Sequence, residues 1–196
     1  MSEARTSRIE HSIRQSVAVK QALLEDRALV DTIAAVAGEF VKALQGGRKI
    51  LLFGNGGSAA DAQHIATEFV GRFQRERSPL PALALTVDTS ALTGIANDYG
   101  YENVFARQVT ALGSKGDVAV GISTSGKSPN VLKGLDAART KAVVTVGLTG
   151  KNTGPLSEHA QYCIGVPADL TTRIQETHIL IGHILCEIVE DELVTK

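Results

Sequence analysis

Two loops rich in glycine and hydroxyl side chains each follow a short apolar run. Residues 54–58 (Gly-Asn-Gly-Gly-Ser) come after Ile-Leu-Leu-Phe, and residues 123–128 (Ser-Thr-Ser-Gly-Lys-Ser) come after Val-Ala-Val-Gly-Ile. A strand that runs into such a turn and then into a helix directs backbone N–H groups toward one point, where α/β proteins hold anions. The two loops therefore predict an anion-binding site.

The segment after the first loop carries groups able to move protons or to bind a metal. His64 and Glu68 are four residues apart and share one face of the expected helix, and Asp61 lies one turn earlier. This arrangement can bind a divalent cation or serve as acid and base. Alone it is a weak signal, because a solvated His–Glu pair one helical turn apart is common.

A second polar cluster lies near the end of the chain, where Gln175, Glu176, His178 and His183 occur within ten residues. Most positions from 179 to 185 are apolar, so a histidine there lies near buried surface. A core histidine with satisfied hydrogen bonds and a histidine in a functional site are both open interpretations. The spacing does not decide whether His178 or His183 faces the site.

The first loop also matches a dinucleotide-binding pattern. Residues 54–59 fit Gly-x-Gly-x-x-Ala, and Asp88, at the end of the next expected strand, stands where a ribose-binding acid belongs. Against this, Asn55 and Ser58 offer polar side chains that a pyrophosphate turn does not need. We expect a sugar phosphate here rather than NAD.

The second loop matches a Walker A pattern over residues 121–128. Pro129 argues against a true P-loop, because the residue before proline is pushed out of the helical backbone region. The helix should begin at Pro129, with Ser128 as its N-cap and Lys127 outside it, so we expect no ATP binding.

What remains in the second loop is a hydroxyl-rich turn suited to one phosphate monoester, although any single hydroxyl could simply be a helix cap. These hydroxyl groups belong to Ser123, Thr124, Ser125 and Ser128.

Asn97 and Asp98, before Tyr-Gly-Tyr, indicate a turn. An Asx turn is the favoured interpretation, and a contact to a sugar hydroxyl is the alternative.

The elements that must position these groups alternate along the chain. Residues 6–45 show helical apolar spacing. The expected strands are 49–54, 81–86, 117–123, 142–148 and 162–167, and the expected helices are 57–73, 101–112, 129–140 and 171–194, with shorter turns near 89–97 and 154–159. Apolar strands separated by helices predict an α/β fold with a parallel sheet covered on both faces.

Composition narrows the classes of function. With 196 residues, 43% hydrophobic and 21% charged, the chain is expected to form one domain. The 20 Lys and Arg against 21 Asp and Glu, and 4% aromatic residues without Trp, argue against nucleic acid or an anionic membrane as a partner. An N-terminus without an apolar stretch, no run long enough to span a membrane, and two cysteines without a CxxC spacing favour a cytoplasmic protein.

Taken together, several separated segments resemble the sugar isomerase (SIS) domain family, specifically the bacterial phosphoheptose isomerases. The segments that carry the resemblance are residues 54–64, 97–100, 121–126 and 173–178. The resemblance extends over essentially the whole chain. Motifs in this order are much more specific than either glycine loop alone.

The resemblance implies a flavodoxin-like three-layer αβα sandwich with a five-stranded parallel sheet and N-terminal helices. The chain would be a single SIS domain over residues 1–196, with 6–45 serving oligomerisation and 46–196 forming the core. It further implies a homotetramer with active sites at subunit interfaces. The implied reaction converts sedoheptulose 7-phosphate to D-glycero-D-manno-heptose 7-phosphate, the first step toward ADP-heptose.

The resemblance also implies roles for single residues. The family's zinc ligands, for one Zn²⁺ per subunit, correspond to His64, Glu68, Gln175 and His183. Gln175 as a ligand rests on the resemblance alone. The expected substrate contacts are Asn55, Gly56, Gly57, Ser58, Glu68, Asn97, Asp98, Ser123, Thr124, Ser125, Ser128 and Gln175. The chain departs from some relatives at Thr172, where they carry an acidic residue.

This chemistry is consistent with the residues. Interconversion of a ketose and an aldose moves a proton between C1 and C2 through an enediol, which needs a base and an acid. Glu68 and His183 are the candidates, with Asp61 next in line. One alternative is a non-catalytic SIS protein, either a replication-initiator-binding tetramer or a sugar-phosphate-sensing regulator. Another is an isomerase of hexose or pentose phosphates.

Overall fold

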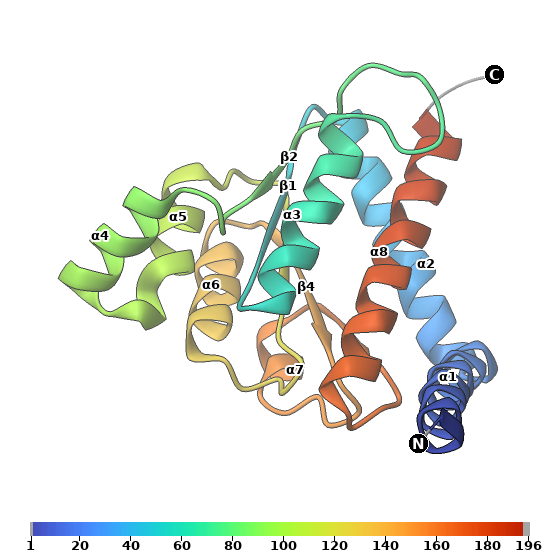
Figure 1. Ribbon diagram of the computed structural model, residues 1–196. Coiled ribbons are helices and arrows are strands. Elements are labelled where there is room, and N and C mark those ends of the chain that lie inside the picture. Colours follow the sequence, from blue (N-terminus) through green and yellow to red (C-terminus); the bar gives the residue numbers. More distant parts are fainter. Residues whose placement is uncertain (1, 194–196) are drawn as a thin grey trace.

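Five parallel strands form the centre of the computed structural model, which describes residues 2–193 (Figure 1). Their order in the sheet is β2-β1-β3-β4-β5. The strands are β1 (Ile50–Gly54), β2 (Ala82–Ala84), β3 (Val118–Ile122), β4 (Val144–Thr149) and β5 (Tyr162–Gly165). β1 and β3 are buried along their whole length, which explains why their sequences are apolar at successive positions. The five expected strands are confirmed.

The helices correspond to the expected ranges, but α3 ends three residues early, residues 101–103 form a 3₁₀ turn, and two larger differences occur. They are α1 (Ser2–Glu25), α2 (Arg27–Gln45), α3 (Gly57–Val70), α4 (Thr89–Tyr99), the 3₁₀ turn η1 (Tyr101–Asn103), α5 (Val104–Leu112), α6 (Pro129–Thr140), α7 (Leu156–His159) and α8 (Thr171–Leu193). Asp26 divides the first helical stretch, because its carboxylate caps α2 by accepting the N–H of Leu29 at 3.0 Å. The segment expected as a short turn near 89–97 is the full helix α4.

Helices cover both faces of the sheet and produce the three-layer αβα sandwich (Figure 1). Side chains of β1 alternate between the two faces. Ile50 and Leu52 join the core under α2, α3 and α8, while Leu51 and Phe53 join the core under α5 and α6. The fold class predicted from the sequence is confirmed.

The strand order places both glycine loops at one crevice. From β1 the chain crosses to β2 on one side, and β3 lies on the other side of β1, with Gly54 paired to Ile122 where both strands end. Loops that leave neighbouring strands toward opposite sides open the crevice in which α/β proteins of this order bind ligands.

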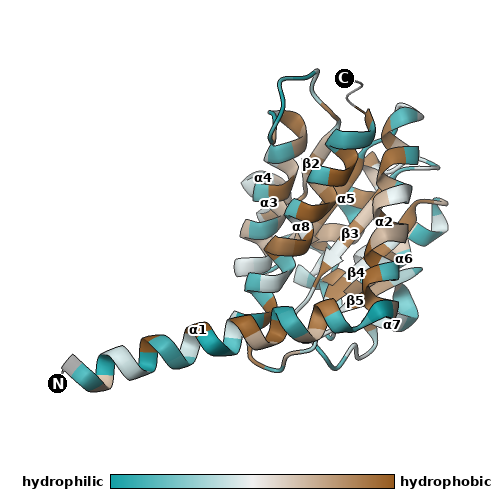
Figure 2. Ribbon diagram, turned by 90° about the vertical axis from the view of Figure 1, so that its right-hand side faces the viewer, coloured by the Kyte–Doolittle hydropathy of each residue, from teal (hydrophilic) through white to brown (hydrophobic). Residues whose placement is uncertain are grey.

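Helix α1 extends away from the rest of the molecule (Figure 2). It carries exposed apolar side chains, with Ile9, Ile13, Val17 and Leu24 each at least 58% exposed. Within residues 2–193 there is no helix long and apolar enough to cross a membrane.

Helices α3 and α8 approach each other closely at one point. A Cβ added to Gly182 of α8 would lie 2.5 Å from Cδ1 and 2.7 Å from Cγ1 of Ile65 on α3. Glycine is otherwise unfavourable inside a helix, so its presence here is explained by this packing. The contact lies directly beside His183, the next residue of α8.

We predict opposite effects for two glycine-to-alanine changes in helices. Gly182→Ala should lower the free energy of unfolding by about 1–3 kcal/mol, because the added methyl group overpacks the contact with Ile65. Gly38→Ala, in the middle of α2 with open space around it, should raise it by up to about 1 kcal/mol through helix propensity. Denaturant titration measures both. An unchanged stability of Gly182→Ala would show that α3 and α8 can move apart freely.

Candidate active site

The first loop brings the chain of β1 tightly into α3. A Cβ at Gly54 would lie 2.8 Å from the carbonyl oxygen of Ile122, and Gly56 has a φ of 56°, so both positions need glycine. Any side chain on Gly57 would overlap the amide of Gln175, which therefore lies directly over the start of α3. Ser58, expected to contact substrate, is only 3% exposed and lies against Gly54.

The second loop gathers hydroxyl groups. Ser123 Oγ lies 2.9 Å from Ser128 Oγ and 3.5 Å from Ser125 Oγ. Ser128 is the N-cap residue before Pro129, as expected, but its hydroxyl bonds to Ser123 rather than capping α6. Thr124 belongs to the same turn, and its carbonyl accepts the N–H of Gly150 at 3.2 Å. Three hydroxyls that face one another can share the oxygens of a single phosphate group.

A buried asparagine that the sequence analysis missed joins the two loops. Asn130 of α6 is 3% exposed, and its amide exchanges two hydrogen bonds with the amide of Asn55, at 2.8 and 2.9 Å. The hydroxyl of Tyr101 donates to Asn55 Oδ1 at 3.1 Å. With its oxygen doubly occupied, Asn55 keeps one N–H of its amide for a ligand. Asn130 follows Pro129 in the first turn of α6, and no sequence motif singles it out.

His64, Glu68 and His183 form a compact group on α3 and α8, with ligand atoms all within 4.8 Å of one another. His64 Nε2 lies 3.1 Å from Glu68 Oε1 and 3.2 Å from His183 Nε2. Two ligand atoms on one tetrahedral zinc ion, each about 2.0–2.1 Å from it, are separated by about 3.3 Å. The three side chains therefore fit a metal ion of this kind. The ring of Phe73 stacks against the ring of His183, with 5.5 Å between the ring centroids.

The two histidines of α8 have different environments, which settles the choice that spacing left open. His183 faces the cluster, whereas His178 is fully buried and bonds through Nε2 to the carbonyl oxygen of Thr149 at 3.0 Å. Burial lowers the pKa of His178 to about 4, against the smaller opposing effect of that hydrogen bond. His178 is a neutral core residue.

Asp61 lies one turn before His64 in a partly buried position. Its Oδ2 atom is buried and has no hydrogen-bond partner among the described residues. Burial raises the pKa of the Asp61 carboxyl above its usual value, and nearby His64 offsets part of that effect. A partly desolvated carboxyl with a raised pKa, next to a histidine, is the type of group found at functional sites.

One expectation about the region before Tyr101 needs correction. Asn97 and Asp98 lie in the last turns of α4 and not in an Asx turn, because the helix continues to Tyr99 and ends at Gly100, whose φ is 84°. Both are exposed, and Asn97 Nδ2 donates to Asp98 Oδ1 at 2.9 Å. Asp88, in the place of a ribose-binding acid, caps α4 by accepting the N–H of Ala91 at 2.9 Å.

Comparisons with known proteins identify the family to which the chain belongs. A model described as the SIS domain matches residues 13–150. "Phosphoheptose isomerase 2" of Campylobacter jejuni is 54% identical over 97% of this chain and 94% of its own length. A phosphoheptose isomerase of Aneurinibacillus thermoaerophilus is 53% identical over 94% of this chain and 93% of its own length. The structure of the phosphoheptose isomerase of Neisseria gonorrhoeae superimposes with a TM-score of 0.89 at 42% identity, over 95% of this chain and 98% of that one.

We predict a pH-dependent loss of stability that depends on His178. The folded state keeps this side chain neutral down to about pH 4, whereas the unfolded chain protonates it near pH 6.5. Between these values the unfolded state binds more protons, so the free energy of unfolding falls as the pH drops, by on the order of 3 kcal/mol from this residue.

His178→Gln keeps a donor for the Thr149 carbonyl, and it should remove the contribution of His178 to the pH dependence of the free energy of unfolding. His11→Gln, on the exposed surface of α1, should leave it unchanged. Denaturant titrations of the three proteins from pH 7 to pH 4 make the comparison. Identical pH profiles for wild type and His178→Gln would contradict the assignment of His178 as a neutral core residue.

Proposed function

Because the chain belongs to the SIS domain family, we propose that it is a phosphoheptose isomerase that interconverts sedoheptulose 7-phosphate and D-glycero-D-manno-heptose 7-phosphate. The observation that carries the proposal is the His64–Glu68–His183 cluster, which is formed by α8 and by α3, the helix that begins at the first loop. The identity above 50%, over nearly the full length, to proteins that bear this name supports the choice of substrate.

The second loop is proposed to hold the phosphate group. Ser123, Ser125 and Ser128 present their hydroxyls to one another at the N-terminal end of α6, where the helix dipole favours an anion. Thr124 lies in the same turn. Binding energy gained at the phosphate, remote from the reacting carbons, holds C1 and C2 at the other end of the crevice.

The first loop and its neighbours are proposed to hold the sugar chain. Asn55, fixed by Asn130, offers an N–H to a sugar oxygen, and Gln175 lies over Gly57 from the other side. Gly56, Ser58, Asn97 and Asp98 complete the set of substrate contacts inferred from the resemblance. The exposed side chains of Asn97 and Asp98 are available for sugar hydroxyls.

Proton transfer between C1 and C2 is assigned to Glu68 and His183. They come from two helices that meet at the cluster, and Glu68 lies next to His64. One removes the proton from carbon while the other supplies a proton to the sugar oxygen, and the enediol connects the two steps. Asp61, with its raised pKa, is the next candidate for the base.

A zinc ion bound by His64, Glu68 and His183, with Gln175 as the fourth ligand, is part of the proposal. It would stabilise the negative charge that develops on the substrate oxygens. Two imidazole nitrogens and a carboxylate oxygen are ligands that zinc prefers. Gln175 lies two helical turns before His183, on the same face of α8. Glu68 would then be both ligand and base, so the two roles alternate as substrate binds.

A homotetramer with active sites at subunit interfaces is proposed because α1 has an apolar face. Ile9, Ile13 and Val17 are exposed at helical spacing on a helix that extends from the core (Figure 2). Such a face is typical of surfaces that other subunits cover. A cytoplasmic location is proposed as well, and the free thiols of Cys163 and Cys186 fit a reducing compartment.

The test of the reaction uses three substrates. Sedoheptulose 7-phosphate should be converted to an aldose, with solvent deuterium entering at C2. Fructose 6-phosphate and arabinose 5-phosphate should react far more slowly. Equal turnover of a hexose or pentose phosphate would show that the enzyme is not specific for a heptose phosphate. If none of the three substrates underwent aldose–ketose exchange, the result would favour a non-catalytic regulator.

Variants should separate chemistry from binding. Glu68→Gln and His183→Gln should lower kcat about 10²–10⁴-fold at saturating substrate, because each removes a proton-transfer group. Ser125→Ala should chiefly raise KM, by an amount equivalent to roughly 1 kcal/mol, since it removes one hydrogen bond to phosphate. Retention of most of kcat by Glu68→Gln would restrict Glu68 to metal binding and move the base to Asp61.

Metal analysis tests the zinc site. Purified wild-type protein should hold about one zinc ion per subunit, and His64→Ala and His183→Ala should each lose it, because each removes an imidazole ligand. His159→Gln, on a surface helix away from the cluster, should retain it. Full metal content in both cluster variants would reject this site.

Light scattering tests the assembly. The wild-type protein should be a tetramer at micromolar concentration. Ile13→Glu combined with Val17→Glu should yield smaller species, because charges would be buried at the interface. His11→Glu, on the opposite face of the same helix, serves as the control. A monomeric wild type would contradict the proposed role of α1.

A further inference from the structure

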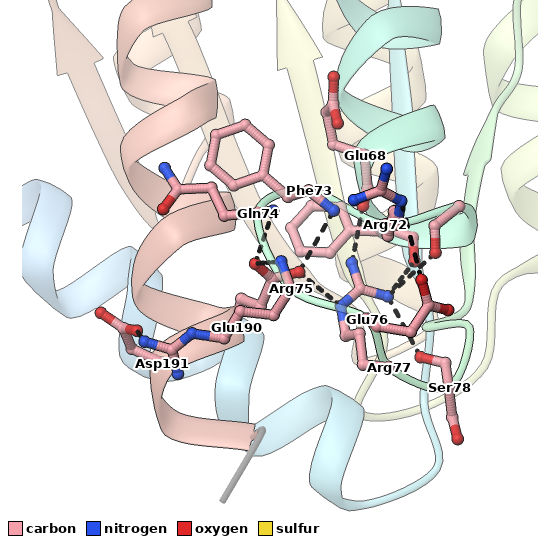
Figure 3. A network of polar contacts seen from close by, with 12 residues as sticks. Glu68, Arg72, Phe73, Gln74, Arg75, Glu76, Arg77, Ser78, Glu190 and Asp191 are labelled. Atoms are coloured by element: carbon pink, nitrogen blue, oxygen red, sulfur yellow. Dashed lines mark hydrogen bonds and ion pairs between the residues drawn. The ribbon is translucent and has the colours of Figure 1, made fainter. Parts of the chain in front are cut away.

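The loop between α3 and β2, residues 71–81, is irregular but is held by two buried charged side chains (Figure 3). Arg77 lies in the loop and Glu190 lies near the end of α8. Their side chains are 5% and 3% exposed, and Arg77 Nε donates to Glu190 Oε1 at 2.9 Å. A buried ion pair persists where further hydrogen bonds satisfy both partners.

The guanidinium of Arg77 binds the C-terminal end of α3. It donates to the carbonyl oxygens of Glu68 at 2.7 Å and Phe69 at 2.8 Å, with a weaker contact to Gly71 at 3.4 Å. The last carbonyls of a helix have no partner within the helix, and they carry partial negative charge. Arg77 therefore caps the helix at the very residue, Glu68, whose side chain belongs to the metal-binding cluster.

The carboxylate of Glu190 binds the other half of the loop. It accepts the backbone N–H groups of three successive residues, Phe73 at 3.2 Å, Gln74 at 2.8 Å and Arg75 at 2.9 Å (Figure 3). Burial tends to raise the pKa of Glu190, but the three N–H groups and Arg77 outweigh it and hold the pKa below its usual value. Glu190 is therefore a charged anchor on α8 at neutral pH.

Arg77 and Glu190 each bind the backbone of a residue that belongs to the cluster or contacts it. Arg77 holds the backbone of Glu68. Glu190 holds the backbone of Phe73, whose ring stacks on His183 with an interplanar angle of 25°. His183 and Glu190 are seven residues apart on α8, roughly 10 Å along the helix. The ion pair thus joins the two helices that carry the ligands and fixes the loop that packs on one of them.

We propose that Arg77 and Glu190 are positioning residues for the His64–Glu68–His183 cluster: together they set the placement of α3 against α8 and hold Phe73 on His183. The inference rests on the proposed metal site. Groups that orient metal ligands from outside the coordination sphere typically contribute 10–100-fold to metal affinity.

The test compares two ion pairs of the same loop and helix. Arg77→Met and Glu190→Gln break the buried pair, whereas Arg75→Met and Asp191→Asn break the neighbouring exposed pair between Arg75 and Asp191. Competition with a chromogenic chelator measures Zn²⁺ affinity, and calorimetry measures the affinity for inorganic phosphate. The buried-pair variants should bind Zn²⁺ about 10–100-fold more weakly, with phosphate affinity unchanged. The exposed-pair variants should match wild type in both.

Arg77→Lys sharpens the test, because lysine can pair with Glu190 but cannot bond to several carbonyls at once. It should recover only part of the lost Zn²⁺ affinity. Phe73→Leu removes the ring contact while leaving the buried pair intact, and it should also weaken Zn²⁺ binding. Since Phe73 is only partly buried, this variant keeps the proposal testable if Arg77→Met does not fold.

A readout without metal separates this proposal from the zinc site itself. In the metal-free protein, the imidazole NMR signals of His183 should shift in Glu190→Gln and Phe73→Leu, and those of His11 and His159 should not. Failure of wild-type protein to bind Zn²⁺ would overturn the metal site of the proposed function and leave this NMR test in force. Unchanged His183 signals and unchanged Zn²⁺ affinity in destabilised variants would show that the ion pair serves stability alone.

Discussion

The close approach of α3 and α8 is the contact on which the candidate site depends. His64 and Glu68 are neighbours on one helix by spacing alone, but His183 reaches them only because Gly182 lets α8 pack against Ile65. A larger residue would push the helices apart at the position next to His183. Interhelical distances depend on the side chains at the contact, and ligand atoms must lie within a few tenths of an ångström of their places for tight metal binding.

The two ends of the site are built by different means. At the proposed phosphate end, backbone turns and hydroxyls lie at the ends of neighbouring parallel strands, and the Asn55–Asn130 pair joins one loop to the helix that follows the other. At the proposed proton-transfer end, side chains from two helices meet, and their placement depends on packing and on the loop that follows α3. The two loops joined by Asn55 and Asn130 suit the proposed role of holding the phosphate group of the substrate. The side chains on the two helices suit the proposed role of moving protons at the other end.

Buried polar groups show which residues are structural and which are reactive. Glu190 accepts hydrogen bonds from three backbone N–H groups and from Arg77, and His178 is bonded to a backbone carbonyl, so each is stable in one protonation state. His178 Nδ1 and Asp61 Oδ2 are both buried without a partner among residues 2–193, but burial keeps the imidazole neutral, whereas it raises the pKa of a carboxyl that lies beside His64. A buried carboxyl left unsatisfied costs stability, and such groups are concentrated where function needs them.

The sequence by itself determined the parallel sheet, the two loops at the ends of β1 and β3, the start of α6 at Pro129 and the pairing of His64 with Glu68. These features depend on periodicity, on turn chemistry and on spacing within one helix, all of which are local. Only the tertiary structure decided that His183 and not His178 faces the cluster, that Asn130 fixes Asn55, and that Arg77 pairs with Glu190 across 113 residues of sequence. The physical reason is that burial and partner choice between distant elements depend on how helices pack, which no local pattern encodes.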